Sequence, residues 1–162
     1  MERATNPEAA LRMLNQEPPP SVILIADAAV ARKKQLWERV IDRLRGGSTV
    51  VLAGCFSTMV TQGGFDAMFA RLGLPWRRGS NYRETLRLRR DVVGSRLANR
   101  LPPAYSQKAV FVKNVDGSDA WYTDGDEAAV VFATVGAGKL GYVGDVDGEE
   151  ETDAVVLAMC GF

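Results

Sequence analysis

The chain has 162 residues, of which 46% are hydrophobic and 25% are charged. This length suits one domain with a core of its own, so we expect a single domain over residues 1–162. Basic and acidic side chains number 20 each, and no apolar run approaches the roughly 18 residues of a membrane span, so we expect no membrane insertion and no general attraction to nucleic acid.

The chain contains no histidine, so it has no imidazole to act as a general base, a proton shuttle or a metal ligand. Its two cysteines, Cys55 and Cys160, are too few for a disulfide framework and lack the spacing of a metal site. The first residues lack the pattern of a signal peptide. We therefore predict reduced thiols, a cytoplasmic location, and neither a cofactor nor a bound metal.

The first half of the chain alternates helical and strand-like segments. Asn6, Pro7 and Glu8 have the residue types of an N-cap, a first-turn proline and a first-turn acid, which predict a helix over residues 7–17. Helix, strand, helix and strand with short connections indicate an α/β sandwich with right-handed crossovers. The next expected elements are buried strands at 21–27 and 48–54, with an amphipathic helix at 31–45 between them.

The second half is richer in strands. Its segment VGAGKLG contains a glycine and lysine pair, but Ala133 and Leu140 stand where a P-loop needs glycine and a hydroxyl residue, so we interpret it as a hairpin turn. The expected elements are a helix at 65–73, strands at 83–90 and 108–114, two β segments within 127–146 and a closing helix at 151–159.

Charge is unevenly distributed along the chain. Residues 77–100 contain eight arginines, interleaved with Tyr82, whereas residues 116–162 contain eleven acidic residues and one lysine. The arginines could form a solvated strand face or a basic docking stripe. Because the whole chain is neutral, we expect them to pair within the chain or between subunits, and we do not expect nucleic-acid binding.

The segment AAVVFATVGAGKLGYVGDVDGEEETDAVVLAMCGF, residues 128–162, resembles the closing strand, turn, strand and helix of class I glutamine amidotransferase-like domains, particularly the ThuA-like branch. The runs at 21–27 and 48–54 fall where this superfamily has its second and third central strands. The resemblance implies a three-layer sandwich with a mostly parallel, flavodoxin-like central sheet. The superfamily begins with a strand, and none precedes residue 7, so we expect an uncovered edge at 21–27 and a homo-oligomer that covers it.

The match departs from the glutaminases of this superfamily at the residues that perform catalysis. Those enzymes place cysteine in a Gly-x-Cys-x-Gly elbow and pair it with histidine and glutamate. Here Gly54 directly precedes Cys55, Ser57 replaces the second glycine, and Asp145 or Asp147 lies in the region of the histidine. A carboxylate, whose usual pKa is near 4, is a weak base for a thiol and repels a thiolate. We therefore predict that the chain is not a glutaminase.

Three interpretations of Cys55 are open: a packed and inert thiol, an exposed thiol activated by a helix N-terminus, or a nucleophile assisted by a base other than histidine. The carboxylates of Asp27, Asp145, Asp147 and Glu149 could converge on a divalent cation. A solvated acidic loop that caps the last helix explains Glu149, Glu150, Glu151 and Asp153 just as well, and we favour that interpretation.

These observations predict a non-catalytic amidotransferase-like domain that binds a small molecule or a protein partner in a crevice around Cys55. The alternative is a hydrolase that uses a carboxylate and metal site, or a cysteine nucleophile without histidine. The residues expected to bind the ligand are Asp27, Gly54, Phe56, Ser57, Asp145 and Asp147.

Overall fold

The structure is a computed structural model that describes residues 1–162. Its strands are β1 (Val22–Ile25), β2 (Thr49–Leu52), β3 (Arg77–Arg87), β4 (Ala104–Lys113), β5 (Ala120–Thr123), β6 (Ala128–Val135) and β7 (Gly138–Val143). Its α-helices are α1 (Pro7–Leu14), α2 (Ala29–Arg32), α3 (Lys34–Arg45), α4 (Phe56–Met59), α5 (Gln62–Arg71), α6 (Arg90–Val93), α7 (Ser95–Ala98) and α8 (Glu150–Met159). A short 3-10 helix, Gly117–Asp119, precedes β5.

The seven strands form one mixed sheet in the order β1-β2-β7-β6-β4-β3, with β5 also paired to β6. Only the pairs β1 with β2 and β2 with β7 are parallel. The other four pairs are antiparallel. The α/β class is confirmed, but the expectation of a mostly parallel, flavodoxin-like sheet was wrong.

A tight hairpin accounts for one of the four antiparallel pairs, β6 with β7. Two residues, Gly136 and Ala137, join β6 to β7, and a connection this short forces the two strands to run antiparallel. Gly136 adopts φ +59°, and a Cβ atom there would lie 2.9 Å from the Cα of Arg45. The predicted hairpin turn is thus confirmed, and it reverses the chain beside the central strand β7.

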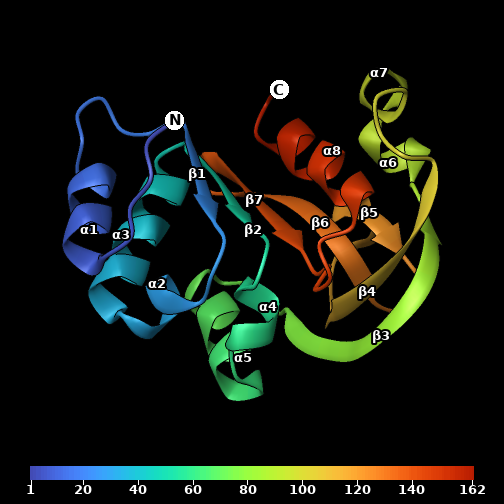
Figure 1. The fold of residues 1–162 in the computed structure, drawn as a ribbon, viewed down its shortest axis with the longest axis horizontal. Helices are drawn as coiled ribbons and strands as arrows, with labels where there is room; N and C mark the ends of the chain where they lie inside the picture. Colours follow the sequence, from blue (N-terminus) through green and yellow to red (C-terminus); the bar gives the residue numbers. More distant parts are fainter.

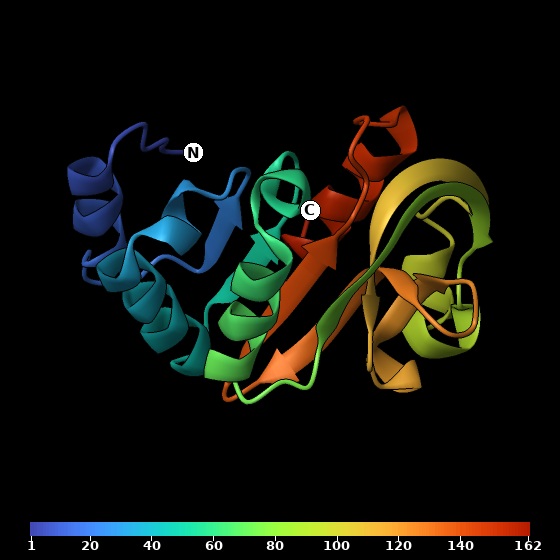
Figure 2. The ribbon, with the colours of Figure 1, turned by 90° about the horizontal axis from the view of Figure 1, so that it is seen from below.

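Helices cover both faces of the sheet (Figures 1 and 2). On one face, α1, α3, α4 and α5 pack over a core that includes Leu44, Phe69 and Tyr142. On the other face, α7 and α8 pack over a second core that includes Phe111 and Met159. The sheet is therefore the middle layer between two layers of helices.

The segments predicted from the sequence differ from the structure mainly at their boundaries. The Asn6 side chain caps α1 by accepting a hydrogen bond from the Ala9 N–H, as predicted. The helix expected at 31–45 is divided into α2 and α3 at Lys33. The strand expected at 83–90 begins earlier, at Arg77. No helix in the structure is both long enough and apolar enough to span a membrane.

Candidate ligand-binding crevice

The carboxyl ends of the parallel strands β1, β2 and β7 lie side by side. In this section, 'edge' means the side of the sheet where these strands end. The Cys55 N–H donates to the Ala26 carbonyl oxygen at 2.9 Å, which ties the segments after β1 and β2 together. Gly54 makes this approach possible: it has φ +61°, and a Cβ atom there would lie 2.9 Å from the same oxygen. The Ser57 hydroxyl donates to the Gly144 carbonyl oxygen at 3.5 Å, which brings in the end of β7.

Cys55 lies at the N-cap position of α4, and its side chain is exposed. No hydrogen bond reaches its sulfur atom from any side chain or backbone group of the chain. The two residues that follow are different: Phe56 is 1% exposed within the core, and Ser57 is fully buried. Of the predicted elbow residues, only the cysteine therefore presents its side chain to solvent.

The carboxylate of Asp27 also lies at this edge, but it already has a partner. It accepts a hydrogen bond from the Ala29 N–H at 2.8 Å and so shapes the turn into α2. Asp27 is exposed, and no side chain of opposite charge contacts it.

Asp145 accepts hydrogen bonds from residues at the start of α8. Its buried carboxylate accepts hydrogen bonds from the N–H of Asp147 at 3.1 Å, from the N–H of Glu149 at 2.7 Å and from the Thr152 hydroxyl at 2.7 Å. The Tyr105 hydroxyl lies 3.2 Å from that of Thr152, and burial raises the pKa of Tyr105 to about 12. All these partners hold Asp145 in a structural role.

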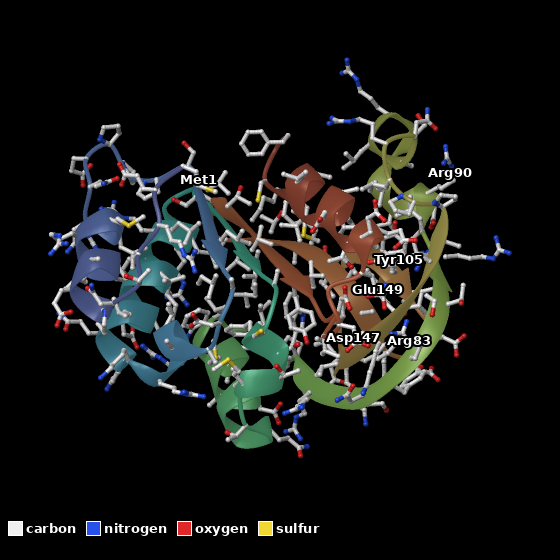
Figure 3. The ribbon with its side chains drawn as sticks, in the orientation of Figure 1. Met1, Arg83, Arg90, Tyr105, Asp147 and Glu149 are labelled. Atoms are coloured by element: carbon white, nitrogen blue, oxygen red, sulfur yellow. The ribbon has the colours of Figure 1, made fainter.

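Asp147 and Glu149 point toward Arg83 on β3 (Figure 3). The Arg83 guanidinium lies 2.8 Å from a carboxylate oxygen of each, and these contacts, that of Glu149 foremost, raise the pKa of Arg83. Two arginines of the basic segment, Arg83 and Arg89, thus form ion pairs within the chain, as the charge pattern suggested. No group of three or more acidic or cysteine side chains is placed to hold a metal ion.

A small apolar pocket of about 160 Å³ lies beside this edge, between α2, α4 and α5. Met59 and Met68 contribute its longest apolar side chains, and Arg32 lies at its rim, donating to the Met59 carbonyl oxygen at 3.1 Å. Sequence reasoning missed this pocket, because nothing in the order of residues shows that α2 and α5 face each other. Its lining residues are Ala28, Ala31, Arg32, Met59, Val60, Thr61, Gly64 and Met68.

A second hollow, of about 410 Å³, is polar and wide open, and it lies at the far end of β3 and β4. The Tyr82 hydroxyl donates to Asp124 at 2.5 Å, and Glu127 accepts from the Ser80 N–H at 3.1 Å. These polar groups already have hydrogen-bond partners within the chain. The hollow also has few apolar walls, so the smaller pocket is the better place for a ligand. The residues around this hollow are Ser80, Tyr82, Lys113, Asn114, Asp124, Asp126 and Glu127.

No protein-family model matches the chain, and no curated protein matches it in sequence. Among solved structures, it is similar to a β-galactosidase from Bacillus circulans sp. alkalophilus, with a TM-score of 0.62 and 15% identity. The match covers 91% of this chain but only 23% of the β-galactosidase chain. At this identity the likeness shows the fold alone: the same arrangement of helices and strands occurs as one part of a longer protein.

Proposed function

We propose that this chain is a non-catalytic binding domain, related to the amidotransferase-like domains, that holds a small ligand or a partner segment in the pocket between α2, α4 and α5. Neither Cys55 nor any other residue predicted from the sequence to bind the ligand lines this pocket. The pocket between α2, α4 and α5 carries the proposal. It follows the carboxyl ends of β1 and β2, where ligands gather in α/β sheets. The two free thiols, Cys55 and Cys160, support a cytoplasmic location.

The pocket supports a particular ligand chemistry. A guanidinium has five N–H donors, and Arg32 uses one of its nitrogen atoms for the Met59 carbonyl, which leaves donors free for an anion. A volume of about 160 Å³ has room for a short aliphatic chain. The matching ligand is a carboxylate with a short aliphatic chain, either free or as the carboxylate and apolar side chain of a partner peptide.

The surroundings of Cys55 favour binding over catalysis. A nucleophilic thiol needs a nearby group to take its proton, and the carboxylates of Asp145 and Asp147 are bonded to α8 and to Arg83 instead. A hydrolase that uses Cys55 as a nucleophile without histidine is the second candidate, which the exposure of the Cys55 thiol favours.

A series of linear carboxylates, from acetate to hexanoate, tests the proposal by thermal unfolding. We expect the unfolding temperature to rise most with the four- and five-carbon acids, because a ligand that binds only the folded state stabilises it. The corresponding neutral amides should give no rise. Arg32→Gln should abolish the response, whereas the matched control Lys34→Gln, which removes an exposed charge outside the pocket, should keep it.

Two outcomes would contradict the proposal. The first is an unfolding temperature that no acid changes, or that changes equally in Arg32→Gln. The second is ammonia release from glutamine, or hydrolysis of another amide or ester, that Cys55→Ser abolishes, which would favour the enzyme.

A further inference from the structure

Strand β1 forms one edge of the sheet and has a strand partner on one side only. The Ser21 and Ile25 carbonyl oxygens accept from the N–H groups of Thr49 and Ala53, at 2.9 and 3.0 Å. Successive residues of a strand direct their backbone groups to opposite sides. Val22 and Leu24 therefore direct their N–H and C=O groups away from β2, toward the open edge.

The face of β1 that carries Leu24 is apolar and uncovered. Leu24 is 48% exposed, and β1 contains no charged residue. Helix α8 packs on this face of the sheet over β2 and β7, and Figure 1 shows no helix in front of β1. The backbone of residues 1–6 makes no hydrogen bond to the strand. An uncharged edge with free backbone groups is a template for another strand.

The geometry of β1 is complementary to itself. In an antiparallel pair of two copies, with the twofold axis at Ile23, Val22 of each copy lies opposite Leu24 of the other, and both residues exchange backbone hydrogen bonds. Side chains opposite one another share a face, so two copies of Val22 and Leu24 form one apolar cluster. The prolines at 18–20 lack N–H groups and confine the pairing to residues 21–25.

Charge does not oppose this partner. The paired residues of β1, Val22–Ile25, include no charged side chain, so an antiparallel pair of two copies brings no like charges together within the strands. The opposite edge of the sheet, β3, contains four arginines, which would repel a second copy of itself.

We propose that two copies of this chain associate through β1, paired antiparallel, to form one continuous sheet across the dimer. The proposal is independent of the ligand at the crevice, because β1 meets its partner along its edge and not at its carboxyl end.

Sedimentation velocity over a range of protein concentrations tests this interface. We expect a dimer at tens of micromolar, and a monomer at the same concentration for Leu24→Lys, because each lysine would lie opposite Val22 of the other copy and place a charge in the apolar cluster. The matched control is Leu157→Lys on α8, since Leu157 is 52% exposed but lies outside β1, and it should leave the dimer unchanged.

A backbone variant keeps the test decisive if Leu24→Lys fails to fold. Val22→Pro removes an N–H that points to the open edge and that no bond within the monomer uses, so it should give a folded monomer. A monomeric parent chain, or a dimer that survives both β1 variants, would overturn the proposal. Loss of the dimer in Leu157→Lys alone would assign it to α8. A dimer that disappears in a longer form of the protein would mean that a further segment occupies the edge.

Discussion

The two edge strands of the sheet end it in different ways. β1 has four residues and no charged side chain, and it pairs with one strand only, the parallel strand β2. β3 has eleven residues and four arginines, and its side chains are tied to two acidic loops, through Tyr82 to Asp124 and through Arg83 to Asp147 and Glu149. Charge and side-chain contacts protect an edge strand from pairing with other strands, so β3 is the better protected of the two edge strands within the monomer.

The largest expected effect is on the free energy of unfolding, when a side chain of β1 that faces the core is shortened. Ile25 is 5% exposed and packs in the core beneath α3, so Ile25→Ala should lower the free energy of unfolding by about 2–5 kcal/mol. Leu24→Ala, one residue away on the open face, should change it by less than about 0.5 kcal/mol in the monomer. Urea unfolding at a concentration where the chain is monomeric measures both. If both substitutions lower the free energy of unfolding equally, other residues of the same chain cover Leu24.

A smaller effect is expected at the centre of β3. Tyr82→Phe removes the hydrogen bond to Asp124 and should cost about 1 kcal/mol near neutral pH. Although burial acts to raise the pKa of Asp124, its hydrogen bonds from Tyr82 and from the N–H groups of Asp126 and Glu127 outweigh burial and lower that pKa.

The pH dependence of this difference follows from the lowered pKa of Asp124. A carboxyl group with a lower pKa in the folded state stabilises the fold fully above its unfolded pKa, near 3.9, and loses that contribution as the pH falls through the folded value. The gap between the parent chain and Tyr82→Phe, measured by urea unfolding, should therefore shrink below about pH 4. A gap that is constant between pH 7 and pH 3 would show that the contribution of the Tyr82 hydroxyl does not depend on the charge of Asp124.

The smallest effect is expected at Arg83. Its ion pairs with Asp147 and Glu149 are at the surface, so Arg83→Gln should lower the urea midpoint only slightly, and the difference should vanish at high salt. Arg96→Gln, which removes an exposed arginine that makes no ion pair, is the matched control. If the urea midpoint falls equally in both variants, the loss of net charge lowers the stability, and the ion pairs of Arg83 with Asp147 and Glu149 do not contribute to it.

Much of the parallel half of the fold could be predicted from the sequence. The apolar runs at 21–27 and 48–54 and the N-cap at Asn6 are local signals, and the structure contains them. The error came from extending the parallel arrangement to the whole sheet. The antiparallel pairing of β3, β4 and β6 depends on which strands meet across long loops, and local periodicity contains no information on that.

The candidate site was predictable in position but not in the direction of its side chains. The segments around Asp27, Cys55 and Asp145 do converge at one edge of the sheet. The Asp145 carboxylate turns toward α8, because the N–H groups at the start of that helix need acceptors. Sequence reasoning weighed helix capping for the acidic loop from Glu149 onward, and it placed Asp145 in the crevice.

The position of β7 between β2 and β6 also affects how the chain acquires its structure. β2 finds its second neighbour only when residues 139–142 have been made, so the centre of the sheet cannot close during synthesis of the first two thirds of the chain. Contacts of such wide sequence separation slow folding and leave apolar strands exposed on the nascent polypeptide. We therefore expect β1 and β2 to need shielding, by a chaperone or by the ribosome surface, until the last quarter of the chain emerges.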